Sequence, residues 1–207
     1  LVSSTDIASV LGLKEYAEFL NGFNELCTRQ CDFFLREFNS KRLRDDGSHF
    51  EIETTGDELV VFLHTSKPHN DVYQLICLAI ALKCGWICMP HNRERLKNGF
   101  PCTELAVGIH SGKVWAERTP DGMEKKGFTI NLAKRTETLS RMGERFRIFL
   151  TDAAFKQINR RIRNILFGER TISNMKGVVI PMAAFEIHET FINPGVRLAP
   201  DYRNCFL

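Results

Sequence analysis

The spacing of apolar and polar residues predicts short strands and amphipathic helices along the first half of the chain. Residues 14–38 carry apolar side chains at three- and four-residue spacing, which is typical of a long amphipathic helix. Residues 50–54 and 58–63 are two apolar runs separated by Gly56-Asp57, which predicts a hairpin with a tight turn. We expect a second helix at about 70–86 and a loop at 90–101.

The second half of the chain continues with the same two kinds of pattern. Strands are expected up to Asp6, on both sides of Gly112, at 147–151, at 170–175 and at 183–189, and helices near Asn131 and after Asp152. Because strands and helices are mixed along the chain rather than strictly alternating, we predict an α+β fold in which helices cover a mostly antiparallel central sheet.

Composition narrows the class of protein. The 207 residues are 43% hydrophobic, which suffices for one core, so we expect one domain at 1–190 and a C-terminal extension at 191–207. The net charge of +3 is mild and basic residues lie among acidic ones, so we expect no nucleic-acid partner. No apolar run reaches membrane-spanning length, so we expect a cytoplasmic protein that binds no membrane. The seven cysteines include no CxxC pair, which argues against zinc and for reduced thiols.

Three placements of polar residues suggest chemistry. Asp6 and Asp57 would converge at one end of a sheet if their strands are neighbours, as a pair of divalent ions requires. Asn131 and Arg135 are four residues apart on one helix face, where an amide and a guanidinium could contact ribose and phosphate. Lys176 could bind a phosphate. Each residue also has a structural explanation: a helix cap, a turn, a solvated helix face and an exposed loop lysine.

The order of these residues resembles the catalytic domain of class III nucleotidyl cyclases, the adenylate and guanylate cyclases. "DIAS" at 6–9 stands where the family has its first metal motif, D-I-x-G-F-T, and "TTGDELVVF" is similar to the second metal strand and turn. "AVGIHSGKV" is similar to the G-I-H-x-G strand, and "GFTINLAKRTETLS" to G-x-x-V-N-x-A-x-R. "RIFLTDAAF" and "NMKGVVIPMAAFEI" resemble the last strands. The resemblance covers about residues 2–188, but "SVL" replaces the G-F-T after the first metal aspartate.

The resemblance implies a class III cyclase fold of the ferredoxin-like palm type and the cyclisation of a nucleoside triphosphate. The ribose 3′-oxygen would attack the α-phosphorus and pyrophosphate would leave, with two divalent ions, Mg²⁺ or Mn²⁺, as cofactors. It also implies a homodimer with two equivalent sites at the interface. The residues that it assigns are Asp6, Ile7 (through its carbonyl) and Asp57 for the metals, Asn131 for the ribose, Arg135 for the α-phosphate and Lys176 for the triphosphate.

The residues expected to read the base argue against ATP. Family adenylate cyclases read adenine with a lysine before the metal turn and an aspartate before the asparagine helix, where this chain has Glu53 and, nearby, Glu124. Adenine N1 is an acceptor, whereas a carboxylate suits the donor edges of guanine, cytosine or uracil. Phe50 could fill the pocket beside a smaller base. The chain also resembles the compact bacterial pyrimidine cyclases of anti-phage signalling, which favours CTP or UTP; the alternative is that Glu53 is a solvent-facing strand residue.

Three other functions are compatible with the sequence. The chain could be a guanylate cyclase, or a degenerate cyclase domain that binds nucleotide without catalysis, which the missing G-F-T favours. It could also be a diguanylate cyclase, because "TTGDEL" is similar to a G-G-D-E-F turn. That last hypothesis leaves "GIHSG", Asn131 and Arg135 unexplained.

Overall fold

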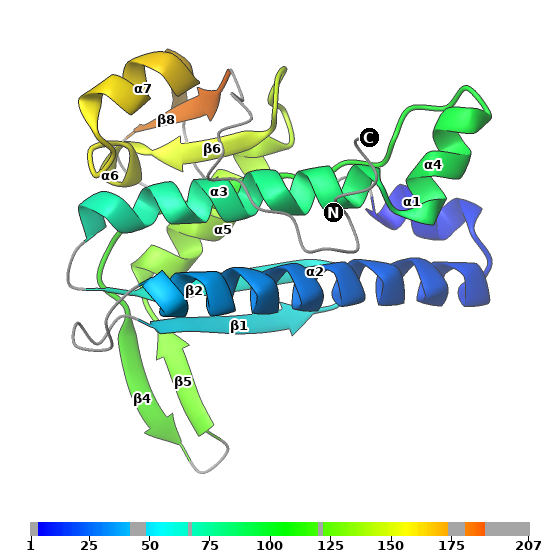
Figure 1. Cartoon of the computed structure of the whole chain (residues 1–207), viewed down its shortest axis with the longest axis horizontal. Coiled ribbons are helices and arrows are strands. Elements are labelled where there is room, and N and C mark those ends of the chain that lie inside the picture. Colours follow the sequence, from blue (N-terminus) through cyan, green and yellow to red (C-terminus); the bar gives the residue numbers. More distant parts are fainter. Residues whose placement is uncertain (1–3, 42–48, 66–67, 120–121, 174–180, 189–207) are drawn as a thin grey trace. The chain divides into compact units, whose positions relative to one another are not determined.

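The computed structural model describes residues 4–41, 49–65, 68–119, 122–173 and 181–188 (Figure 1). The described residues form two compact units: residues up to 65 together with 74–105, and residues 68–73 together with 106–188. The expected domain at 1–190 stays a prediction, and the extension at 191–207 lies outside the described residues.

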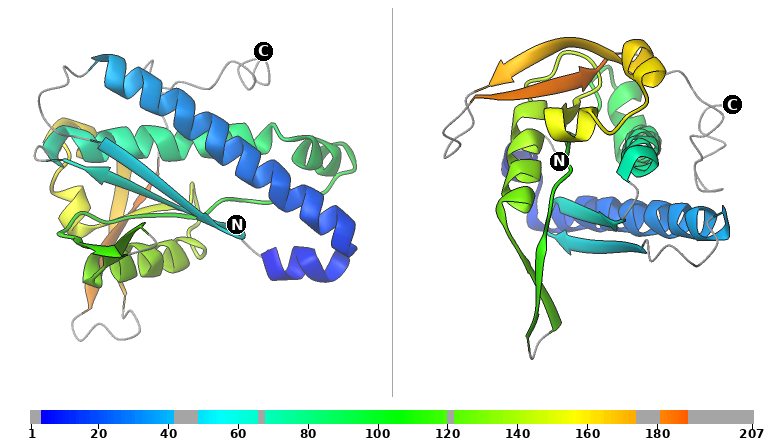
Figure 2. Two further views of the ribbon diagram at one scale, coloured as in Figure 1. Left: turned by 90° about the horizontal axis from the view of Figure 1, so that it is seen from below. Right: turned by 90° about the vertical axis from the view of Figure 1, so that its left-hand side faces the viewer.

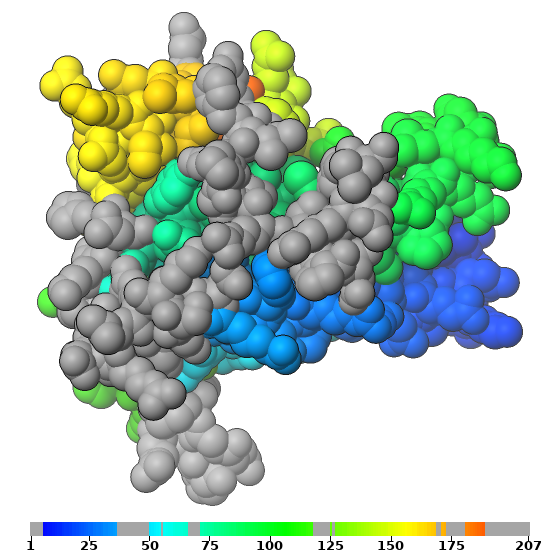
Figure 3. Space-filling view, viewed as in Figure 1, coloured from blue at the N-terminus to red at the C-terminus, as the bar shows by residue number. Residues whose placement is uncertain are grey.

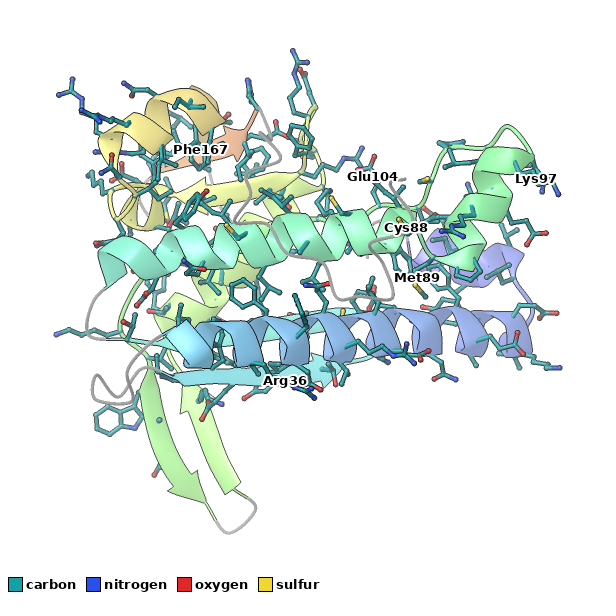
Figure 4. All side chains as sticks on the ribbon, in the orientation of Figure 1. Arg36, Cys88, Met89, Lys97, Glu104 and Phe167 are labelled. Atoms are coloured by element: carbon teal, nitrogen blue, oxygen red, sulfur yellow. The ribbon has the colours of Figure 1, made fainter. Side chains whose placement is uncertain are left out.

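The core of the first unit lies between two long helices, α2 (Leu13–Lys41), which the apolar spacing predicted, and α3 (Pro68–Ile87), which was expected at about 70–86. Phe19 and Phe23 on α2 pack edge-on against Trp86 of α3, with ring centroids 5.3 and 5.8 Å apart. Such aromatic pairs add about 0.5–1.5 kcal/mol beyond the burial of their area. Met89, at the junction that follows α3 (Figure 4), reaches Gly22 of α2, where an added Cβ would lie 3.2 Å from the Met89 methyl carbon.

The predicted hairpin is confirmed. β1 (His49–Thr55) pairs antiparallel with β2 (Glu58–His64), and the pair from Thr55 to Glu58 leaves a two-residue turn, Gly56-Asp57. Gly56 has φ 58°, a left-handed conformation that glycine adopts without the steric cost of a side chain. A positive φ at the first turn residue alone is the pattern of a type II′ turn, whose twist matches that of the two strands.

The prediction of a loop at 90–101 is wrong in part, because residues Pro90–Lys97 form helix α4. Pro90 begins α4 at a position where the missing N–H costs nothing. The buried side chain of Asn92 then holds the helix: it donates to the Trp86 carbonyl at 2.8 Å and accepts from the N–H and hydroxyl of Thr103, each at 2.8 Å. The outer side of α4, including Lys97, is exposed (Figures 3 and 4).

The second unit contains a four-stranded sheet with the order β3-β6-β8-β7. Its strands are β3 (Val107–Ile109), β6 (Ile148–Thr151), β7 (Phe167–Ser173) and β8 (Met182–Ile187). β3 and β6 are parallel, and the other pairs are antiparallel. Every residue of β6 is buried, so side chains cover both faces of this strand. The expected α+β class is confirmed.

Three helices belong to this sheet. α5 (Phe128–Ser140), expected near Asn131, packs against β3 and β6, and α6 (Asp152–Phe155) against β6 and β8. The N-cap of α6 is Thr151, whose hydroxyl accepts from the Ala154 N–H. The short helix α7 (Arg160–Leu166) was not expected.

A two-stranded ribbon formed by β4 (Trp115–Thr119) and β5 (Gly122–Lys126) extends away from the four-stranded sheet (Figures 1 and 2). β4 was expected and β5 was not. Within the described residues no single helix is long and apolar enough to cross a membrane; helical residues 71–87 and 90–97, which meet at a 56° bend, pass this test only as a pair, by length and composition.

Candidate active site

Asn131 and Arg135, the two residues predicted to contact ribose and phosphate, lie four positions apart on α5. Asn131 is exposed and Arg135 is half-buried. α5 begins after Gly127, and no side chain caps it. The first N–H groups of a helix have no partner within the helix, so this end of α5 favours an anion.

Arg135 carries an unsatisfied hydrogen-bond donor. Its Nη1 is buried and has no hydrogen-bond partner among the described residues. An unpaired buried donor costs about 1–3 kcal/mol, so a bound acceptor would stabilise it. A phosphate oxygen is the acceptor whose charge and geometry suit a guanidinium best. The structure therefore presents Arg135 as a donor suited to an anionic ligand.

The first glycine of "GIHSG" explains how α5 is held. A Cβ at Gly108 of β3 would lie 2.7 Å from the carbonyl carbon of Thr136 and 2.5 Å from the carbonyl oxygen of Ala133. Since both obstacles are backbone atoms of α5, no side-chain movement could relieve the overlap. Thr136 is fully buried at this contact, and its hydroxyl donates to the Leu132 carbonyl at 2.7 Å. The glycine thus permits the close packing that positions Asn131 and Arg135.

The histidine of the same motif pairs with the end of β6. His110 Nδ1 lies 2.8 Å from the hydroxyl oxygen of Thr151. Because β3 and β6 are parallel, their carboxyl ends meet at one edge of the sheet and bring these two residues together. Burial lowers the pKa of His110 below its ordinary value, which favours the neutral imidazole.

Asp57 and two of the residues predicted to contact the base lie on the β1–β2 hairpin. The Asp57 side chain is half-buried in the turn, and Glu53 is exposed on β1. Phe50 packs edge-on against Phe34 of α2, with ring centroids 5.7 Å apart. Phe50 therefore has a packing role of its own, and the base-binding roles of Phe50 and Glu53 stay predictions.

The strand expected up to Asp6 is wrong, because residues Ser4–Val10 form helix α1. Ser, Thr and Asp residues at the start of this segment favour a helix N-terminus, and this local preference outweighs the short apolar alternation. The Asp6 side chain is exposed, and the Ile7 carbonyl accepts the Leu11 N–H at 2.9 Å within the helix. The metal-binding roles of Asp6 and Ile7 stay predictions. The strand end that was expected to place Asp6 beside Asp57 is replaced by a helix.

Two further predicted residues have no described side chain. Lys176 lies outside the described residues. The backbone of Glu124 belongs to β5, where it pairs with Glu117 of β4. Their predicted contacts with triphosphate and base stay predictions.

The carboxylate of Asp57 is a ligand of the type that divalent cations bind. Within the described part of the chain, no group of three or more His, Cys, Asp or Glu side chains could hold a metal ion. Mg²⁺ is usually bound by one or two carboxylates together with substrate phosphates and water, so a three-residue cluster is not required. The oxygen donors of Asp57 fit a cation of this kind.

Glu186, which is buried on β8, was not among the predicted site residues. The sequence feature that points to Glu186 is an acidic residue inside the apolar strand "MAAFEI". A buried carboxylate requires hydrogen-bond donors nearby. The pairing of His110 with Thr151 was missed as well, because it depends on the parallel arrangement of β3 and β6.

A family model for the adenylate and guanylate cyclase catalytic domain matches residues 15–189. The match includes Asp57, Asn131, Arg135 and Lys176, and it begins after α1. A comparison with curated protein sequences finds no match.

Solved structures share this fold at low sequence identity. The adenylyl cyclase CyaB from P. aeruginosa is 17% identical with a TM-score of 0.65, over 93% of this chain and 91% of that one. The guanylyl cyclase Cya2 is 17% identical with a TM-score of 0.67, over 94% and 91%. An adenylate cyclase from Trypanosoma brucei is 18% identical with a TM-score of 0.56, over 89% and 84%. At these identities the likeness shows the fold alone.

Proposed function

The chain belongs to the family of adenylate and guanylate cyclase catalytic domains and is an enzyme of the nucleotidyl cyclase class, and from this premise we propose that it cyclises a pyrimidine nucleoside triphosphate, CTP or UTP. The ribose 3′-oxygen attacks the α-phosphorus of the same nucleotide, the 3′-hydroxyl loses its proton, and pyrophosphate leaves in line. The product is the 3′,5′-cyclic nucleotide.

The observation that carries the phosphate chemistry is the unpaired Nη1 of Arg135. A donor that is fixed before the reaction stabilises the charge that develops on the α-phosphate without reorganisation. Asn131, one helical turn earlier, orients the ribose so that its 3′-oxygen faces the phosphorus. Lys176 binds the triphosphate.

Asp57 contributes a carboxylate to the binding of Mg²⁺ or Mn²⁺, with Asp6 and the Ile7 carbonyl as further ligands. Two such ions, when bound, lower the pKa of the 3′-hydroxyl and offset the charge of the β- and γ-phosphates. Asp57 comes from one copy of the chain, and Asn131 and Arg135 from a second copy, so that a homodimer has two equivalent sites.

Glu53 supports the choice of base. Glu53 is exposed on β1, three residues before the Gly56-Asp57 turn. A carboxylate accepts from cytosine N4–H or uracil N3–H and cannot donate to adenine N1. Guanine, which offers N1–H and N2–H, is the second candidate on the same observation. A pyrimidine cyclase of this size would serve bacterial anti-phage signalling, in which the cyclic nucleotide acts on a separate effector.

Incubation of the purified chain with ATP, GTP, CTP and UTP, each with Mn²⁺, tests the proposal when products are resolved by mass. We expect cyclic CMP or cyclic UMP. Asp57→Asn and Arg135→Ala should each lower the rate by about 100-fold or more. Lys134→Ala, which removes an exposed basic residue beside Arg135, is the matched control and should keep the rate.

Each other product has a defined meaning. Cyclic GMP or cyclic AMP would overturn the pyrimidine substrate and retain the cyclase mechanism. A cyclic or linear dinucleotide would assign the chain to the diguanylate type. The absence of any product, with nucleotide still bound, would overturn catalysis in favour of a nucleotide-binding domain.

A further inference from the structure

Glu186 holds the loop that follows α5. The residue is 6% exposed, and its carboxylate accepts three backbone hydrogen bonds. The donors are the N–H groups of Glu144, Arg145 and Arg147, at 3.2, 2.9 and 3.0 Å. A buried carboxylate is costly unless donors compensate for the lost water. Each of these donors comes from the α5–β6 loop, so the loop and Glu186 depend on each other.

The backbone of this loop is shaped around the carboxylate. Arg147 has φ 51°, a left-handed conformation that is uncommon for residues other than glycine. This conformation accompanies the hydrogen bond from the Arg147 N–H to Glu186. Gly143 lies directly against the carboxylate, because an added Cβ would be 3.0 Å from Glu186 Cδ and 2.8 Å from the Phe149 ring. The loop therefore has little freedom while Glu186 is in place.

α5 is thus held at two separate points. Its middle packs on Gly108 of β3, where the backbone of Thr136 leaves no room for a methyl group. Its C-terminal end continues into the loop that Glu186 binds. α5 also packs against β6, and the attachment at its C-terminal end restrains its tilt further. Arg135 lies within the contact with Gly108, and Asn131 lies less than one turn before it. A tilt of α5 therefore changes where both side chains point.

We propose that Glu186 is a positioning residue for the cyclase reaction: its hydrogen bonds to the α5–β6 loop set the tilt of α5 and thereby the positions of Asn131 and Arg135. This inference rests on the function proposed above. Glu186 itself contacts no substrate. A displacement of about 1 Å in a residue that positions the reacting groups can lower a rate by about 100-fold.

The first test compares two neighbouring residues of β8. Glu186→Leu removes every acceptor for the loop, whereas Ile187→Ala removes buried apolar volume from the same strand and leaves the loop hydrogen bonds intact. At a temperature at which both variants are folded, Glu186→Leu should lower kcat by about 100-fold with little change in KM. Ile187→Ala should keep kcat within about threefold. An equal fall in both would assign Glu186 a purely structural role and overturn the proposal.

Two further variants keep the test independent of folding. Glu186→Gln retains the shape of the side chain and one acceptor oxygen, so kcat should lie between that of the wild type and Glu186→Leu, about tenfold below the wild type. This variant carries the test if Glu186→Leu does not fold, and a wild-type kcat would then overturn the proposal. In an Arg135→Ala background, Glu186→Gln should lower kcat by clearly less than its tenfold effect in the wild type, because the part of the effect that acts through Arg135 is already lost and only the part that acts through Asn131 remains.

The design separates the two levels of proposal. If Arg135→Ala retains wild-type kcat, the proposed function fails at Arg135, and the positioning role of Glu186 fails with it. If Arg135→Ala loses activity while folded Glu186→Leu and Glu186→Gln retain wild-type kcat, the proposed function stands and the role of Glu186 is overturned.

Discussion

At the scale of the residue, burial decides the chemistry of the ionisable side chains. Burial raises the pKa of Cys31 to about 12 and raises that of Cys27 further above its ordinary value, so both thiols of α2 stay protonated and unreactive. The same effect lowers the pKa of His110, because a buried imidazole loses more hydration when it is charged. The histidine that contacts Thr151 is therefore mostly neutral.

His110 should make the stability of the fold depend on pH. In the unfolded chain a histidine titrates near pH 6.5, whereas folded His110 takes up its proton only at lower pH. The unfolded state thus binds more protons as the pH falls below about 7.5, and the free energy of unfolding falls with it. Above that pH, His110 contributes no pH dependence.

Urea unfolding at pH 8 and pH 5.5, in the wild type and in His110→Asn, measures this effect. The loss of unfolding free energy between the two pH values should be smaller in the variant, because asparagine does not titrate. The lowered pKa of His91 adds the same term to both proteins and cancels in the comparison. Equal losses would show that His110 is not responsible.

At the scale of the element, the placement of α5 depends on an approach between backbones. Gly108 permits β3 and α5 to pack more closely than any residue with a Cβ could allow. The two residues assigned to the reaction lie on this helix, so the glycine of the motif serves the site through packing rather than through contact with a ligand.

Gly108→Ala should destabilise the protein by about 2–3 kcal/mol, because the added methyl group meets backbone atoms of Ala133, Thr136 and Glu137 that cannot rotate away. Gly112→Ala is the matched control. There the nearest obstacle is the side chain of Thr129, which can rotate at the cost of its hydrogen bond to the Lys113 carbonyl, so about 1 kcal/mol is expected. Urea unfolding measures both variants, and an equal loss would contradict the interpretation.

At the scale of the whole molecule, we propose that each site is built from two copies of the chain. Asp57 belongs to the hairpin, and Arg135 to α5. If each site takes Asp57 from one copy and Arg135 from the other, two inactive variants can complement each other. A mixed dimer of Asp57→Asn and Arg135→Ala contains one site with both changes and one site with neither.

Mixing equal amounts of the two variants should restore about a quarter of the wild-type rate, because about half of randomly formed dimers are mixed and each has one of two sites intact. The rate is measured after the mixture has exchanged subunits, and each variant alone is the control. A site assembled within a single copy would give no recovery at any mixing ratio.

The elements with a clear local period could be predicted from the sequence. α2 follows the three- and four-residue spacing of its apolar side chains, and the hairpin follows two apolar runs around Gly56-Asp57. The spacing of Asn131 and Arg135 is sufficient to place them one turn apart on α5. Such features depend on residues close in sequence, so the chain alone determined them. The motif order similarly determined the family, which the match over residues 15–189 confirms.

Other features depend on segments far apart in the sequence, and only the tertiary structure decided them. Glu186 meets its donors about 40 positions earlier, and His110 meets Thr151 because β3 and β6 run parallel. The strand expected up to Asp6 is wrong for a different, local reason, because the Ser, Thr and Asp residues at its start favour the N-terminus of helix α1. Local patterns determine the period of each element, whereas long-range contacts determine which buried polar groups find partners.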